Sequence, residues 1–149
     1  MNREFKAKNE EMTRRIGEEI GHSSKGCVIA FYGDLGAGKT TMTKGIAKGL
    51  SIEDMISSPT FAILHSYESG RLPLHHLDCY RIEDEDEMEE IGLDDCIYSG
   101  GITVIEWAEN IEGLLPDDTV SIVINTDGES KRTISIDDPK GVLLPLMEI

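Results

Sequence analysis

Hydrophobic residues recur at a helical period in two stretches of the first third of the chain. Over residues 9–20 and again over 40–50, an apolar side chain returns every four positions, which predicts two amphipathic helices. These side chains are Met12, Ile16 and Ile20 in the first stretch and Met42, Ile46 and Leu50 in the second. Gly21 follows the first series and is expected to end it. Between the two helices, residues 27–32 are continuously apolar, which predicts a strand buried on both faces of a parallel sheet.

The remainder of the chain changes to short apolar runs that are typical of strands. Residues 61–67 and 72–80 are separated by a short Gly-containing connection, which favours an antiparallel hairpin at an edge of the sheet. Further strands are predicted over 102–105, 120–124 and 133–136. The expected fold class is α/β, with a mostly parallel sheet, an antiparallel hairpin portion and few flanking helices. No repeat or linker interrupts the pattern, so we expect a single domain over residues 1–149.

Charge limits what such a domain can bind. The chain has 29 acidic and 14 basic residues and a net charge of −15. General positive charge therefore cannot hold a polyphosphate or a nucleic acid, and any anion site must be local. Residues 84–90 include six acids, which we interpret as a solvated helix face rather than a metal cage.

The cysteines and the N-terminal segment indicate in which cellular compartment the protein is expected. Three widely spaced cysteines without a CxxC pair suggest neither a disulfide framework nor a zinc site. The first ten residues are highly charged and offer no apolar stretch for a secretory signal. Apolar runs elsewhere fall far short of the roughly 20 residues of a membrane helix. We therefore expect a soluble, cytoplasmic protein with no membrane partner.

A glycine-rich segment between the predicted strand 27–32 and helix 40–50 matches the pattern G-x-x-x-x-G-K-[ST]. It reads Gly33, Asp34, Leu35, Gly36, Ala37, Gly38, Lys39 and Thr40, with Thr41 after it. Glycines let consecutive backbone N–H groups approach phosphate oxygens at a helix N-terminus. Lysine then supplies a mobile charge for the β and γ phosphates, and the threonine hydroxyl a ligand for Mg²⁺. The strand-loop-helix context predicts a P-loop NTPase with a three-layer fold.

The nucleotide is expected to be ATP. GTPases of this fold carry an N-K-x-D loop for guanine, and the sequence has no such tetrapeptide. A small-molecule kinase is the main alternative, but kinases of this class generally use several arginines to clamp two substrates. Only Arg71, Arg81 and Arg132 follow the loop here.

Two predicted strands end in acids that could complete the site. Glu106 follows the run 102–105, and Asp78 follows His76 at a spacing that places both on one face of a strand. Either acid could orient Mg²⁺ or water. His65, His75 and His76 are a weak metal candidate, because adjacent His75 and His76 point to opposite faces. Trp107 either belongs to the core or lies beside the nucleotide.

Several segments, in this order, resemble one family of small bacterial ATPases, the TsaE (YjeE) family of tRNA threonylcarbamoyladenosine biosynthesis. They are residues 32–41, Ser58-Pro59-Thr60-Phe61, His76-Leu77-Asp78-Cys79-Tyr80-Arg81, residues 89–95 and Ile105-Glu106-Trp107. The phosphate loop alone is common to very many proteins, whereas the other segments together are much more specific. Departures are mild: Cys79, Ala108 and Met42 stand where the family usually has leucine, proline and phenylalanine.

The resemblance implies roles for individual residues. Thr40 and Glu106 resemble the Mg²⁺ ligands, and Lys39 the phosphate lysine. Thr60 resembles a switch residue near the γ-phosphate, and Asp78 a catalytic acid close to the attacking water. Residues that would border the nucleotide are Trp107 at its side and Thr13 and Arg132 at the adenine end.

The resemblance also implies partners. Proteins similar to this one bind ATP and Mg²⁺ and act with a threonylcarbamoyltransferase and its non-catalytic paralogue, of the TsaD and TsaB type, which ATP hydrolysis resets between turnovers. We expect tRNA to be contacted only indirectly, since a strongly acidic chain binds RNA phosphates poorly. Three classes remain: an ATPase subunit that drives a partner's cycle, a free-standing small-molecule kinase, and a nucleotide-gated binding module without significant hydrolysis.

Overall fold

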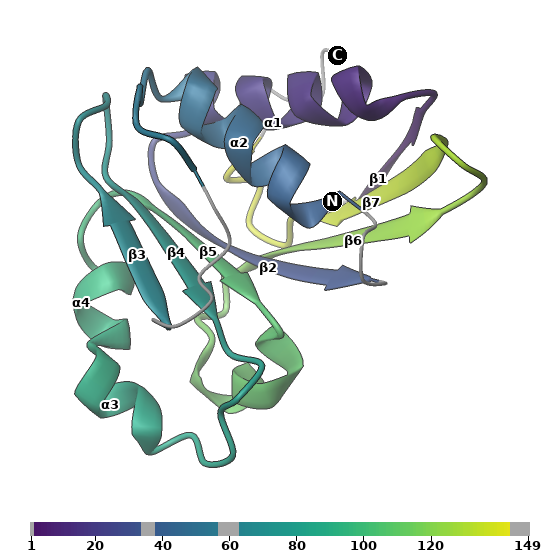
Figure 1. The fold of residues 1–149 in the computed structure, drawn as a ribbon. Helices are drawn as coiled ribbons and strands as arrows, with labels where there is room; N and C mark the ends of the chain where they lie inside the picture. The colour runs from purple at the N-terminus through teal and green to yellow at the C-terminus, as the bar shows by residue number, and fades with distance from the viewer. Residues whose placement is uncertain (1, 34–37, 57–62, 144–149) are drawn as a thin grey trace.

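A computed structural model describes residues 2–33, 38–56 and 63–143, and within them a seven-stranded sheet of order β1-β7-β6-β2-β5-β4-β3 (Figure 1). Strands β6, β2, β5 and β4 are parallel at the centre, whereas β7 and β3 join them antiparallel on the two sides and β1 pairs antiparallel with β7 at the edge. The strands are β1 (Asn2–Ala7), β2 (Cys27–Gly33), β3 (Leu64–Tyr67), β4 (Leu74–Asp78), β5 (Ile102–Glu106), β6 (Val120–Thr126) and β7 (Arg132–Asp137).

Helices cover both faces of the sheet, which makes three layers. Figure 1 shows α1 (Glu10–Ser23) and α2 (Lys39–Gly49) side by side over one face. The short helices α3 (Glu87–Ile91) and α4 (Leu93–Ile97) and the 3₁₀ helix η1 (Ala108–Leu114) pack on the other face. This arrangement confirms the predicted α/β, P-loop NTPase class of fold.

Strand β2 lies at the centre because its residues are apolar on both faces. Ile29 and Phe31 are fully buried in the core beneath α1 and α2. Val28 and Ala30 point the opposite way, into the second core formed with α3, α4 and η1. The continuous apolar run therefore correctly indicated a strand with no solvated face.

Several other elements follow the sequence pattern. The first helix begins after Asn9, whose side-chain oxygen accepts a hydrogen bond from the Met12 N–H at 3.0 Å, a common way to cap a helix. It continues through Gly21, which we wrongly expected to end it. The predicted hairpin is confirmed as β3 and β4, with Leu64 opposite Leu77; residues 61 and 62 of the predicted strand lie outside the described residues. The acidic segment is helical only from Glu87.

The sequence analysis missed one strand and two short helices. Strand β1 is half polar, and we interpreted its charges only as evidence against a signal peptide. Its alternate residues Phe5 and Ala7 nevertheless face the core beneath α1. The strand pairs antiparallel with β7, from the opposite end of the chain. Helices α4 and η1 were also not predicted, because they are too short to show a helical period.

The two long helices cross in backbone contact at glycines. A Cβ atom built on Gly45 of α2 would lie 2.1 Å from the carbonyl oxygen of Arg14, and one on Gly21 of α1 would lie 2.1 Å from that of Ile46. Gly17 and Gly49, one helical turn away, are similarly restricted. Only glycine permits this approach, which explains why Gly21 lies inside the helix instead of after it.

The cysteines and the described helices have ordinary structural surroundings. Cys79 and Cys96 are buried free thiols, and burial raises the pKa of Cys79 to about 12. Burial likewise raises the pKa of Cys27 to about 11. These thiols are therefore protonated at neutral pH, which makes them poor nucleophiles. In the part of the chain that the structure describes, no helix is long and apolar enough to span a membrane.

Candidate functional site

The predicted phosphate loop joins the end of β2 to the start of α2. Gly33 ends β2 with a φ of 127° and Gly38 precedes α2 with a φ of 116°, both in the region that favours glycine. Lys39, Thr40 and Thr41 form the first turn of α2, and residues 34–37 lie outside the described residues. This turn has no acidic residue and no capping side chain. Its backbone N–H groups and Lys39 therefore make the N-terminus of α2 locally positive, which favours the binding of an anion.

Thr13 of α1 lies beside this end of α2. Its side-chain methyl is 3.6 Å from the position that a Cβ on Gly38 would occupy. Its hydroxyl oxygen is buried and makes no hydrogen bond to any residue that the structure describes. The glycine crossing of the two helices produces this proximity. A buried hydroxyl without a partner at the edge of an anion site is a natural contact for a polar ligand.

Two carboxylates meet at the carboxyl ends of β4 and β5. Asp78 is paired in register with Glu106, and Glu106 with Phe31 of β2, so both acids lie one or two strands from the phosphate loop. An oxygen of Asp78 accepts a hydrogen bond from the Tyr80 N–H at 2.9 Å. One oxygen of Glu106 lies 2.6 Å from Nε2 of His76. The structure thus brings together both acids that the sequence singled out.

Trp107 directly follows β5 in a conformation that is rare for its residue type. Its φ of 59° is left-handed, a strain that costs about 1 to 3 kcal/mol and is often found at functional sites. The indole ring is tilted against Tyr80 at 4.9 Å, and Nζ of Lys39 lies 5.6 Å from its centroid. Trp107 also packs against the edge of the second core. Trp107 therefore borders both that core and the phosphate-loop lysine.

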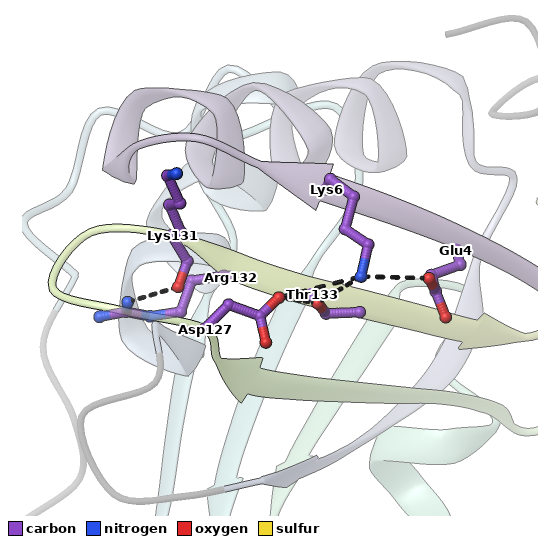
Figure 2. A network of polar contacts seen from close by, with 6 residues as sticks. All are labelled: Glu4, Lys6, Asp127, Lys131, Arg132 and Thr133. Atoms are coloured by element: carbon purple, nitrogen blue, oxygen red, sulfur yellow. Dashed lines mark hydrogen bonds and ion pairs between the residues drawn. The ribbon is translucent and has the colours of Figure 1, made fainter.

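Arg132 begins β7 at the end of the sheet where β2 leads into the phosphate loop. It pairs with Thr126, which lies two residues beyond the partner of Gly33 on β6. Its guanidinium donates to the carbonyl of Lys131 at 2.9 Å and to two other carbonyls of its own turn. Figure 2 shows it next to a polar network in which Lys6 contacts Glu4, Asp127 and Thr133. Arg132 therefore shapes this turn.

The histidines behave as the strand geometry predicted. His75 and His76 face opposite sides of β4: Nδ1 of His75 lies 2.8 Å from the Ser66 hydroxyl, whereas His76 contacts Glu106. Burial lowers the pKa of His75. Within residues 2–33, 38–56 and 63–143, no three His, Cys, Asp or Glu side chains gather as a metal cluster. We considered His76 as a weak metal candidate and as a residue on the same face as Asp78, and missed its bond to Glu106, which depends on the register of β4 against β5. Thr60 lies outside the described residues.

Comparison with known proteins identifies the family. The family model described as threonylcarbamoyl adenosine biosynthesis protein TsaE matches residues 7–134. The chain belongs to the TsaE family. The match includes every described residue of the phosphate loop, both carboxylates and Trp107.

Individual members of the TsaE family agree with this assignment. The chain is 45% identical over 128 residues to the tRNA threonylcarbamoyladenosine biosynthesis protein TsaE of Bacillus subtilis, covering 85% of this chain and 80% of that one. It is 40% identical over 125 residues to the protein of the same name from Treponema pallidum, covering 83% and 92%. The crystal structure of Bacillus subtilis YdiB superposes with a TM-score of 0.80 at 35% identity, covering 99% of this chain and 93% of that one.

The stacking of Lys39 on Trp107 predicts an optical signal. Phosphates that draw the ammonium away from the indole should change the emission of Trp107, which is the only tryptophan in the sequence. We expect ATP and ADP to change the emission intensity and adenosine, which lacks phosphates, to change it little. A spectrum that is the same at saturating ATP would return Trp107 to a packing role.

Proposed function

We propose that this protein binds and hydrolyses ATP as the nucleotide-dependent subunit of tRNA threonylcarbamoyladenosine (t6A37) modification. The observation that carries the proposal is the arrangement of Lys39 at the N-terminus of α2 beside the carboxyl ends of β4 and β5, where Asp78 and Glu106 lie. Family membership supplies the pathway, because relatives are named as proteins of this biosynthesis. The chemistry of the modification itself would be carried out by partners.

The residues at this position suit Mg²⁺ together with ATP. Mg²⁺ is usually held by one or two carboxylates plus substrate phosphates, and hydroxyl and carboxylate oxygens are its preferred ligands. Thr40 and Glu106 would hold the ion in this proposal, and Asp78 is paired with Glu106. When bound, the ion would offset the charge of the β and γ phosphates. The protein's own acids alone would leave that charge uncompensated.

The remaining residues have distinct roles in the proposal. Lys39 leaves the face of Trp107 to bind the β and γ phosphates, and the N–H groups at the start of α2 bind the same oxygens. Asp78 orients the attacking water and accepts its proton, since its second oxygen is not the one bound by the Tyr80 N–H. Thr13 and Arg132 border the adenine end, Thr41 and residues 33–38 complete the phosphate loop, and Thr60 completes the γ-phosphate contacts.

Partners complete the function. We propose that a threonylcarbamoyltransferase and its non-catalytic paralogue, of the TsaD and TsaB type, are reset by this ATPase between turnovers in the cytoplasm. The tRNA would be reached only through them, because net charge of −15 disfavours phosphate contacts. A small-molecule kinase is less well supported, since Arg71 donates to the carbonyls of Gly21 and Ser24 at the far end of α1. It is thus unavailable as a substrate clamp.

The experiment that tests this proposal measures ATP turnover by the protein alone, with the transferase pair, and with the pair plus tRNA. Release of ADP and free phosphate that rises when the pair is added supports the ATPase subunit. A phosphorylated metabolite in place of free phosphate would make the protein a kinase. No hydrolysis under any of these conditions, with ATP bound, would leave a nucleotide-gated binding module.

Asp78 allows the catalytic and binding roles to be separated. Asp78→Asn keeps the size of the side chain but removes the charge that positions water, so turnover should fall on the order of 100-fold or more, while ATP affinity stays within about threefold. Asp95→Asn, an exposed acid on α4, is the matched control and should change neither. If Asp78→Asn instead fails to bind ATP, the residue has a binding or structural role.

A further inference from the structure

His76 of β4 is an imidazole with no solvent contact, and its register partners are Val104 of β5 and His65 of β3. Its side chain is 0% exposed. Leu74, which lies on the same face of β4, belongs to the core beneath α1 and α2. One ring nitrogen, Nε2, contacts Glu106, whereas the other, Nδ1, is buried and has no hydrogen-bond partner in the described parts of the chain. A buried polar atom without a partner costs stability. An apolar side chain would therefore suit this position better if packing were its only purpose.

Among the described residues, the one polar contact of His76 is the short one to Glu106. Nε2 lies 2.6 Å from Oε2 of Glu106, whose side chain is 12% exposed. An ionised carboxylate only accepts hydrogen bonds, so Nε2 must carry the hydrogen. The two residues are diagonal neighbours on adjacent parallel strands, because Val104 is the register partner of His76 and Asp78 that of Glu106. The rigid sheet thus holds the donor in place while the longer glutamate reaches it.

This contact restricts the orientation of the Glu106 side chain and engages only one of its two carboxylate oxygens. A glutamate at the end of a strand has three side-chain torsions, and a hydrogen bond from a fully buried ring removes much of that freedom. Only Oε2 is engaged by His76, and no described residue donates a hydrogen bond to the second oxygen. Hydrogen bonds from outer residues to a metal-binding carboxylate orient it and typically matter 10- to 100-fold for metal affinity.

We propose that His76 is a positioning residue that holds the Glu106 carboxylate in the orientation needed to bind the Mg²⁺ of Mg–ATP. The inference rests on the proposed function, since it concerns the same metal ion. It adds that the metal affinity of the site depends on a residue that touches neither the ion nor the nucleotide. The neighbouring His75, which faces the opposite side of β4 and contacts Ser66, has no such role.

The test measures Mn²⁺ binding by electron paramagnetic resonance in the presence of a non-hydrolysable ATP analogue. His76→Leu removes the donor while keeping an apolar side chain of similar size, and should weaken Mn²⁺ binding roughly 10- to 100-fold. His76→Gln can still donate a hydrogen bond and should recover most of the affinity. His75→Leu is the matched control and should leave Mn²⁺ affinity unchanged. Analogue binding in EDTA should stay within about threefold of wild type in all variants.

Thermal unfolding separates positioning from folding. His76→Leu should unfold at the same or a higher temperature than wild type, because it removes the unpartnered Nδ1. If it does not fold, His76→Met serves as the second apolar variant. Unchanged Mn²⁺ affinity in a folded apolar variant, or an equal loss in His76→Gln, would overturn the proposal. Failure of the proposed function would look different, since the wild-type protein itself would then not bind the analogue.

Discussion

Lys39→Ala is expected to weaken ATP binding on the order of 10- to 100-fold, the size of losing a charged hydrogen-bond donor worth about 1.5 to 3 kcal/mol. The ammonium makes no ion pair in the part of the chain that the structure describes and lies only against the ring of Trp107. Folding should therefore be unaffected, and the melting temperature should stay close to that of wild type. Calorimetric titration with ATP gives the affinity.

The control for this variant lies on the same helix. Lys44→Ala removes an equal charge from an exposed position of α2, so it should leave the ATP affinity within about threefold of wild type. Equal losses in the two variants would mean that only the overall charge of α2 matters. ATP affinity that is unchanged in Lys39→Ala would remove the phosphate-loop assignment altogether.

Gly45→Ala is expected to lower the stability of the protein strongly. Its Cβ would lie 2.1 Å from the backbone carbonyl oxygen of Arg14, so α1 and α2 must move apart. Overpacking of this kind costs about 3 kcal/mol, or roughly 6 to 12 °C in melting temperature for a chain of this size. Helix propensity alone predicts the opposite sign, since alanine is favoured over glycine by about 1 kcal/mol. Thermal or denaturant unfolding measures the difference.

A second glycine provides the comparison. In Gly113→Ala the new methyl would meet only the carboxylate end of the Glu85 side chain, which can move away. This exposed variant should lose less than about 1 kcal/mol. The helix separation in Gly45→Ala should also draw Thr13 away from Gly38 and weaken nucleotide binding. A Gly45→Ala protein as stable as wild type would show that the helices do not depend on their close approach.

The elements that could be predicted from the sequence are those whose pattern is local. The strand 27–32 and the loop after it are encoded by adjacent residues, and so is the hairpin. Contacts between distant segments carry no comparable local signal. The bond from His76 to Glu106 depends on the register of β4 against β5, and the close helix crossing depends on glycines of two helices meeting in space. Glu106 and Asp78 were found because each directly follows an apolar strand.

Strand β1 shows why one element was missed. An edge strand needs apolar residues on one face only, and charges elsewhere on it protect against pairing with other chains. The alternation of Phe5 and Ala7 with Glu4 and Lys6 fits this pattern, but six residues are too few to distinguish it from a charged leader. The pairing with β7, which confirms the strand, involves residues more than a hundred positions away.

The pairing of β1 with β7 has a consequence for synthesis of the protein in the cell. Ala7 pairs with Arg132, roughly 125 residues later in the chain, so β1 leaves the ribosome well before its partner. At translation rates of about 5 to 20 residues per second, β1 waits roughly 6 to 25 s for that partner. During this interval its charged residues Arg3, Glu4 and Lys6 reduce its tendency to pair with other nascent chains. The polar composition of β1 thus protects the nascent chain from aggregation until β1 can pair with β7.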